Sequence, residues 1–258
     1  MSKRSFPSSF TARFLGSALL ALSLCGCQTT GLDDITGALG GKSDKPAATV
    51  EARPDVDGLR ERYRANQNDP NIALAYGKAL RDTGQRSQAA AVLEQAVLVH
   101  SGNKALLAAY GRALADTGKF QQAFDVLSRA HTPEDPDWHI LSAQGAVLDQ
   151  LGRGDEAQQY YASALKIVPD EPSVLSNLGL SYMLQNNLPK AEETLRRAHE
   201  RNPADPRVRA NLAVVVGLQG RDAEAESIVK ADLPPDEAAA KVASLKQLLA
   251  RKQQRADR

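Results

Sequence analysis

The sequence predicts an all-α fold in which five similar helix-turn-helix units follow one another. The segments that begin at Ala75, Ala109, Ala143, Asn177 and Asn211 align without gaps at a constant spacing of 34 residues. A glycine or an asparagine recurs in the middle of each unit, where a turn between two helices needs such a residue. Alanine is abundant and aromatic residues make up only 5% of the chain, which favours closely packed helices over a β-sheet core.

The first 26 residues are expected to be a signal peptide. Residues 1–14 carry Lys3, Arg4 and Arg13 and no acidic residue, and residues 15–24 are apolar or small. The apolar run is too short to cross a hydrocarbon core of about 30 Å as a helix, which takes about 20 residues. A basic start followed by a short apolar core is typical of a secretory signal.

Both cysteines of the chain stand at the end of this run, in Leu24-Cys25-Gly26-Cys27. The stretch resembles the bacterial lipoprotein signal, in which a leucine and small residues precede an obligatory cysteine. The resemblance implies cleavage after Gly26, lipid on Cys27 and, with Gln28 next, a place on the periplasmic face of the outer membrane. The alternative is a C-x-C metal or redox pair, but the chain has no further cysteine to complete such a site.

Residues 27–54 are expected to form the lipidated N-terminus and a flexible tether. They are rich in Gly, Thr and Asp, show no sustained periodicity and end in Pro54. Residues 41–43 (GKS) resemble the end of a phosphate-binding loop, but Thr36 stands where the motif needs a glycine. We therefore expect no nucleotide or other cofactor.

Residues 55–69 are expected to hold a short opening helix, from Val56 to Ala65, and the repeats are expected to fill residues 70–232. A small residue in the first helix of each repeat lets two helices approach closely: Gly77, Gly111, Gly145, Gly179 and Ala213. The expected turn residues are Gly84, Gly118, Gly152, Asn186 and Gly220. Contact positions of the second helices are Ala89, Ala123, Ala157, Ala191 and Ala225, followed by Leu93, Leu127, Tyr161, Leu195 and Val229. Pro169 and Pro203 end two of these second helices.

Residues 233–258 are expected to form a capping helix and a basic tail. Ala238, Val242, Leu245 and Leu249 have the 4-3-4 spacing of an amphipathic helix, which suits covering the last repeat.

A unit of 34 residues with these features resembles the tetratricopeptide repeat (TPR). The resemblance implies a right-handed superhelix whose inner, concave face is lined by the first helices. Together with the lipoprotein signal, the ending NLAVVVGLQGRDAEAESIVKADLPPDEAAAKVASLKQLLA resembles the TadD-like TPR lipoproteins of the tight-adherence (Flp) pilus assembly system. This second resemblance implies an outer-membrane assembly factor whose protein partner is the pilus secretin or another Tad component.

The TPR resemblance also indicates which residues line the inner face. In the first two repeats they are charged, and we expect solvent to reach them: Lys78, Arg81, Asp82, Arg112 and Asp116. In the last two repeats they form an apolar stripe, which suggests a partner: Leu180, Met183, Leu184, Val214 and Leu218. Asn177 and Asn211 stand in the column that holds a peptide backbone in peptide-binding members of the family. The alternative is that the helix expected at residues 236–252 folds back and covers the stripe.

We find no candidate for catalysis or metal binding. The four histidines, His100, His131, His139 and His199, lack metal-ligand spacing, and no Gly-x-Ser-x-Gly motif is present. The formal net charge of +1 does not indicate binding to nucleic acid. The sequence therefore predicts a protein-binding adaptor and not an enzyme. A second interpretation stays open, a periplasmic TPR scaffold that recruits peptidoglycan hydrolases or proteases.

Overall fold

The computed structural model describes residues 55–231, 234 and 247, and the regular elements among them are α-helices. The helices are α1 (Val56–Ala65), α2 (Pro70–Asp82), α3 (Arg86–Val99), α4 (Lys104–Asp116), α5 (Phe120–Ser128), α6 (Trp138–Gln150), α7 (Gly154–Ile167), α8 (Pro172–Leu184), α9 (Leu188–Arg201), α10 (Pro206–Leu218) and α11 (Asp222–Lys230). The expected signal peptide and tether (residues 1–54) lie outside the described residues, as does nearly all of the expected capping helix (residues 233–258).

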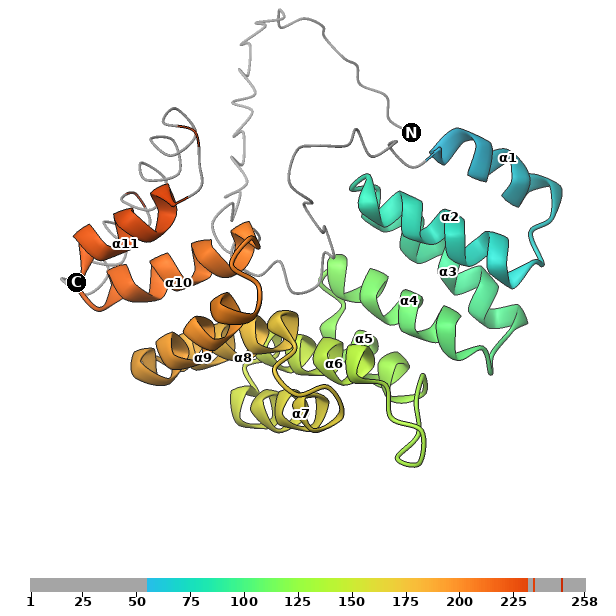
Figure 1. Cartoon of the computed structure of the whole chain (residues 1–258). Helices are drawn as coiled ribbons and strands as arrows, with labels where there is room; N and C mark the ends of the chain where they lie inside the picture. The colour runs from blue at the N-terminus through green and yellow to red at the C-terminus, as the bar shows by residue number, and fades with distance from the viewer. Residues whose placement is uncertain (1–54, 232–233, 235–246, 248–258) are drawn as a thin grey trace, which may run out of the picture. The chain divides into compact units, whose positions relative to one another are not determined.

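Helices α2 to α11 form five successive pairs, which we call repeats 1 to 5 (Figure 1). Within each repeat the first helix packs against the second, and the second packs against the first helix of the next repeat. The first helices α2, α4, α6, α8 and α10 also contact one another in order along the array. The predicted all-α fold of five helix-turn-helix units is confirmed, and α1 lies where the opening helix is expected.

The first helices begin at an acidic or asparagine residue that caps the free N–H groups of the first turn. Asp69 accepts hydrogen bonds from the backbone of Asn71 and Ile72, and Asp205 accepts one from the backbone of Arg207. Proline follows the cap in repeats 1, 4 and 5, where its fixed φ suits a helix start and its missing N–H costs nothing. These capping residues and prolines set the residue at which each new repeat begins.

The glycine in the first helix of repeats 1 to 4 is required by the second helix of the same repeat. A Cβ atom added to Gly111 would lie 2.6 Å from Leu127 Cγ, and one added to Gly145 would lie 2.7 Å from Tyr161 Cε1. Atoms cannot approach this closely without displacement, so a larger residue would push the two helices apart. The predicted close-contact column is confirmed.

The turns inside the repeats use residues with positive φ. Gly152 has φ of 74°, and Asn186, which replaces glycine in repeat 4, has φ of 59°. Both residue types tolerate this left-handed conformation, which ends the first helix and redirects the chain. The prediction that Asn186 takes the place of the turn glycine is confirmed.

Repeat 2 departs from the expected pattern, because its second helix ends early. Helix α5 has 9 residues whereas α3, α7 and α9 have 14, and Ala130 is buried although it lies beyond the helix. The loop after α5 brings His131 Nε2 within 2.9 Å of the Gln144 amide oxygen, and the Gln144 amide donates to Ser128 Oγ at 3.0 Å. Gln144 is fully buried, so the shortened helix supplies the polar partners that this side chain needs.

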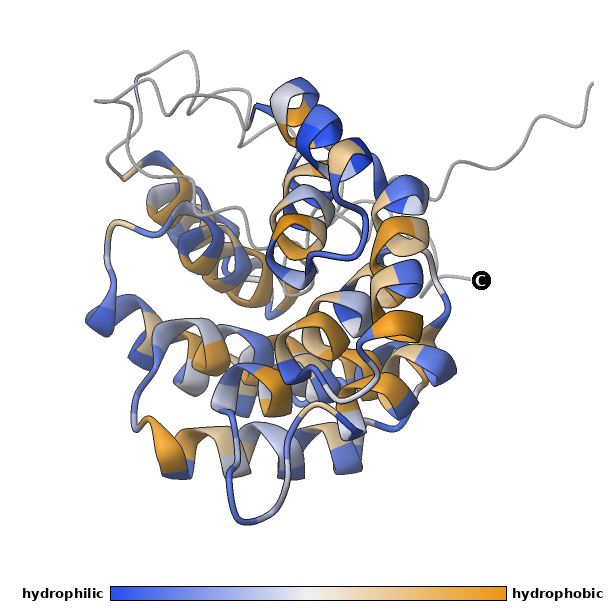
Figure 2. Cartoon of the chain, turned by 90° about the vertical axis from the view of Figure 1, so that its right-hand side faces the viewer, coloured by the Kyte–Doolittle hydropathy of each residue, from blue (hydrophilic) through white to orange (hydrophobic). Residues whose placement is uncertain are grey.

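Apolar residues lie along the helices, and the turns between helices are hydrophilic (Figure 2). The second-helix contact positions at Ala89, Ala123, Ala157, Ala191 and Ala225 are fully buried, as predicted. Among the helices that the structure describes, none is both long and apolar enough to cross a membrane.

Candidate functional site: the inner face of the first helices

The candidate site is the surface formed by the first helices, which we call the inner face. Because α2, α4, α6, α8 and α10 contact one another in order, residues 34 positions apart form rows across the array. One such row contains Lys78, Arg112, Ala146, Leu180 and Val214. Its composition changes from charged residues in repeats 1 and 2 to apolar residues in repeats 4 and 5.

The charged half is less open to solvent than the sequence suggests. Lys78 and Asp82 are exposed, as expected. Arg81 Nε, however, donates to Asp116 Oδ2 at 2.6 Å, and the two side chains are only 12% and 10% exposed. The expectation that solvent freely reaches these two residues is wrong, because the contact between α2 and α4 buries the pair.

Arg112 lies half-buried on α4, close to this ion pair. Burial lowers its pKa and Arg81 adds repulsion, while the carboxylates of Asp137 and Asp116 oppose both effects. Arg112 nevertheless forms no hydrogen bond or ion pair within residues 55–231. A guanidinium with five donors rarely stays unpaired when it is desolvated.

Repeat 3 and the start of repeat 4 hold a half-buried carboxylate between three helices. Asp149, on α6, accepts hydrogen bonds from Ser181 Oγ on α8 at 2.7 Å and from Tyr161 on α7 at 3.0 Å. Burial raises the pKa of Asp149 to about 6, although both hydroxyl groups lower it. Sequence reasoning missed this site. The available signal was Tyr161, which stands in a column otherwise filled by Leu and Val and brings a hydroxyl into the core.

The apolar half divides into covered and open residues. Leu180 and Val214 are buried, with 5% and 9% exposure, and Val214 belongs to the core of repeat 5. The expectation that these two residues form an open stripe is therefore wrong. Met183 and Leu218 pack against the same core and are half-buried. Leu184, at 45% exposure, is the open member of the stripe.

The two asparagines of the candidate site bond across repeat boundaries. Asn177 Nδ2 donates to Ser142 Oγ, and Asn211 Nδ2 donates to Ser176 Oγ, both at 3.1 Å. Each bond joins a residue to the preceding first helix, 35 positions earlier. The bonds fix the orientation of both amides; Asn177 is half-buried, whereas Asn211, at 7% exposure, is buried, so the expectation that Asn211 faces a partner is wrong.

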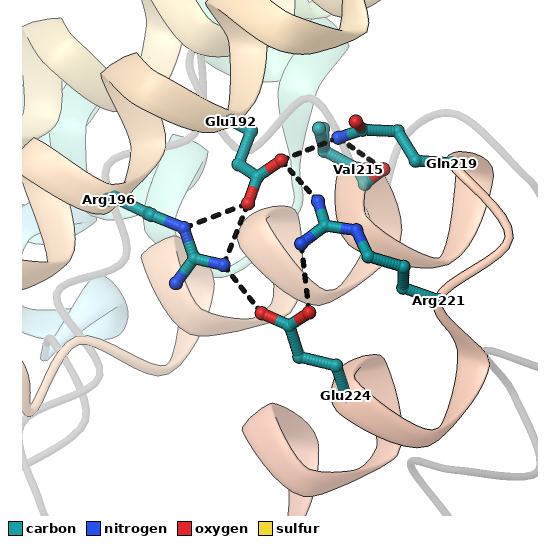
Figure 3. Close-up of polar contacts among 6 residues, drawn as sticks. All are labelled: Glu192, Arg196, Val215, Gln219, Arg221 and Glu224. Carbon is teal, nitrogen blue, oxygen red and sulfur yellow. Dashed lines mark hydrogen bonds and ion pairs between the residues drawn. The ribbon is translucent and has the colours of Figure 1, made fainter.

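A cluster of charges on the second helices holds repeat 5 against repeat 4 (Figure 3). Glu192 accepts from Arg196 at 2.8 Å, from Gln219 at 2.8 Å and from Arg221. Glu224 accepts from Arg196 at 2.5 Å and from Arg221 at 2.8 Å. Burial raises the pKa of Glu192, but the hydrogen bonds from Arg221, Arg196 and Gln219 outweigh it and hold the pKa below its usual range. The cluster fixes the position of α10, which carries Val214 and Leu218.

Two TPR family models match the chain, one at residues 74–137 and the other at residues 150–213. The described array is built of tetratricopeptide repeats. The crystal structure of TTC0263, a TPR protein of Thermus thermophilus, superposes with a TM-score of 0.60 at 20% identity, over 69% of this chain and 99% of that one. A TPR protein from Parabacteroides merdae gives a TM-score of 0.60 at 16% identity, over 77% and 80% of the two chains. At these identities the similarity establishes the TPR fold alone.

No curated protein sequence matches this TPR chain. Within its described residues, no group of three or more His, Cys, Asp and Glu side chains is placed to hold a metal ion. The predicted lipidation site, Cys27, lies outside the described residues. The inner face carries a half-buried arginine, Arg112, in repeat 2 and an exposed leucine, Leu184, in repeat 4.

Proposed function

We propose that this TPR protein is a lipid-anchored adaptor on the periplasmic face of the outer membrane that aids assembly of an Flp (Tad) pilus machine. Its partner would be the pilus secretin or another component of that machine. TPR arrays act as protein-binding scaffolds, which sets the general class of function. The finer assignment is supported by the lipoprotein signal that ends at Cys27 and by the distinctive sequence from Asn211 to Ala250.

The observation that carries the proposal is the position of Leu184 on the inner face. Its exposed side chain lies next to the half-buried Met183, at the end of α8. An exposed apolar side chain on a face lined by first helices suits an amphipathic helix or an extended segment of a partner. Asn177 lies half-buried on the same helix as Leu184 with its amide held by Ser142, which suits a contact to a partner backbone, whereas Asn211 on α10 is buried.

The test is complementation of a deletion strain with Leu184→Asp. We expect loss of surface pili and weaker cross-linking to the secretin, because a charged side chain would be buried in the partner interface. The matched control is Ala162→Asp, which places the same charge at an exposed position on the second helix α7. Both variants should reach wild-type levels on immunoblots and retain their helical circular dichroism. Normal piliation with Leu184→Asp would overturn the role of this face.

The deletion strain also separates this proposal from the scaffold that recruits peptidoglycan hydrolases or proteases. Loss of pili with normal cell shape supports the pilus assignment. Altered envelope integrity with pili intact contradicts it.

A further inference from the structure

The outward side of α3 lacks the charges that the other long second helices carry there. Four exposed residues share this side of α3, and we call them the outer patch: Ala91, Gln95, Leu98 and Val99. Two and three repeats later, the equivalent positions on α7 and α9 are polar or charged with one exception: Gln159, Glu193, Ser163, Arg197, Lys166, Glu200, Arg201 and, as the exception, Ile167. Because these helices share one fold, exposure at these positions selects polar side chains, and α3 departs from that rule.

The outer patch ends in the two large apolar residues that are most exposed in the described part of the chain. Leu98 is 71% exposed and Val99 is 58% exposed. Residues 95–103 contain no charged side chain. Glu94, which precedes this run, is engaged, because its carboxylate accepts from Tyr110 Oη at 3.1 Å. Two neighbouring aliphatic side chains held in water in this way gain stability from any apolar contact.

The outer patch also lies at the end of the array to which the expected anchor is joined. His100, which follows the patch, donates from Nε2 to the Asn68 carbonyl oxygen at 2.7 Å, so the end of α3 lies beside the connection between α1 and α2. Helix α1 has 10 residues, which makes it about 15 Å long. The chain that leads to Cys27 therefore joins the array at Asp55, one short helix away from the outer patch.

Two exposed cations lie at the same end of the array. Arg62 and Arg64 stand in the last turn of α1, just before the connection that His100 contacts. Aliphatic side chains beside exposed arginines are the composition with which proteins lie on a bilayer, since the apolar groups enter the headgroup region and the cations meet lipid phosphates. A second copy of the chain fits less well, because a symmetric contact would bring like charges together.

We propose that the outer patch rests on the bilayer that holds the lipid on Cys27. Leu98 and Val99 would enter the headgroup region, and Arg62 and Arg64 would meet the lipid phosphates. This inference rests on the proposed function, since it needs the lipid anchor. Because α3 is a second helix, the contact leaves the inner face, which the first helices form, free for a protein partner.

The anchor is what makes so small an apolar contact effective. A single myristoyl chain gives only marginal, reversible membrane binding, so two aliphatic side chains would not hold a soluble chain on a bilayer. Residues 28–54 span about 30 Å on average as a random coil, and an anchored array therefore stays close to the membrane. The contact then forms within one assembly, at a high effective concentration.

The test uses the full lipidated chain in vesicles of phosphatidylethanolamine and phosphatidylglycerol. Cys25 leaves with the signal and Cys27 carries the lipid, so Val99→Cys supplies a single thiol for a nitrobenzoxadiazole probe. We expect headgroup-region spin-labelled lipid to quench this probe. Ala162→Cys, at an exposed position on α7, carries the control probe, which should remain unquenched.

A second substitution tests the leucine itself. Adding Leu98→Asp to the Val99→Cys chain should abolish the quenching, because a carboxylate opposes entry into the bilayer. The side chain of Leu98 is exposed, so the variant should keep its helical circular dichroism. Quenching that Leu98→Asp leaves unchanged would overturn the proposal.

Flotation of the vesicles separates failure of this contact from failure of the anchor. A wild-type chain that does not float with the vesicles lacks the anchor, and the inference falls with it. A chain that floats while its Val99 probe stays unquenched overturns this inference alone and leaves the effect of Leu184→Asp on piliation untouched. Shielding of the probe that grows with protein concentration and not with spin-labelled lipid would assign the outer patch to a second copy, and that result also overturns the proposal.

Discussion

Arg221, at the start of α11, donates a hydrogen bond to the carboxylate of Glu192 on α9 and so joins repeat 5 to repeat 4 (Figure 3). Glu192 is only 15% exposed, and it also accepts from Arg196 and Gln219. Isolated surface ion pairs contribute little to stability, but a shared carboxylate with several donors can contribute more.

We expect Glu192→Gln to loosen repeat 5, because the amide removes the charge that both arginines share. The loss should be about 1 kcal/mol at low ionic strength and smaller in high salt. The pKa of Glu192 is depressed in the folded chain, so its contribution is present above the unfolded pKa and is lost as pH falls through the folded pKa. Hydrogen exchange in α11 and thermal unfolding at neutral and acidic pH measure both effects.

Glu156→Gln is the control. Glu156 pairs with Arg153, three residues earlier in repeat 3, and the two side chains are 49% and 39% exposed. It should leave exchange in α11 unchanged. Equal exchange rates in Glu192→Gln and the wild type would show that the cluster does not hold repeat 5.

Ala157 tests the packing between the helices of repeat 3. It is fully buried in a cluster with Leu148, Tyr161 and Val174. A leucine at this position would overpack the contact at a cost of about 1–3 kcal/mol. We expect Ala157→Leu to lower the thermal midpoint by about 2–10 °C. Ala162→Leu, at an exposed position on the same helix, should have no such effect, and equal melting of the two variants would contradict the packing.

The helices and their contacts could be predicted because they follow from residue size at a fixed period. Gly111 must be small since Leu127 fills the adjacent space, and both recur 34 positions apart. The shortened α5 could not be predicted, because it depends on how His131 and Ser128 satisfy one buried glutamine.

The polar contacts of the inner face follow a different spacing from the repeat itself. Arg81 bonds to Asp116 over 35 residues, as Asn177 does to Ser142 and Asn211 to Ser176. When the repeats are aligned at a spacing of 34, each column holds equivalent residues of successive repeats. The bonded partners are 35 residues apart and so stand in adjacent columns, where the alignment does not pair them. The burial of Arg81 was missed for a related reason, since it depends on the contact between α2 and α4.

Cys27 provides a test of the anchor that is independent of the repeats. Three acyl chains stabilise membrane attachment by about 0.8 kcal/mol for each buried methylene, so release of a lipidated protein would be negligible. We expect Cys27→Ser to leave the chain unprocessed or to release it from membranes on fractionation. Cys25→Ser, two residues earlier, should be processed and anchored normally. Mass spectrometry that finds an unmodified Cys27 in the mature wild-type protein would exclude the anchor.

Asp149 should give the array a pH dependence opposite to that of Glu192. Its folded-state pKa of about 6 lies above the ordinary value of 3.8. The folded state therefore binds the extra proton, and the resulting stability is full below the unfolded pKa and is lost as pH rises through about 6.

Asp149→Asn is neutral at every pH and can still bond to Ser181 and Tyr161, because hydroxyl groups both donate and accept. We expect the variant to match the wild type near pH 4 and to exceed its unfolding free energy by up to about 3 kcal/mol near pH 8, as measured by urea denaturation. Asp125→Asn, at an exposed position on α5, should show no such divergence. A constant difference between Asp149→Asn and the wild type across this range would mean that Asp149 stays ionised in the folded array.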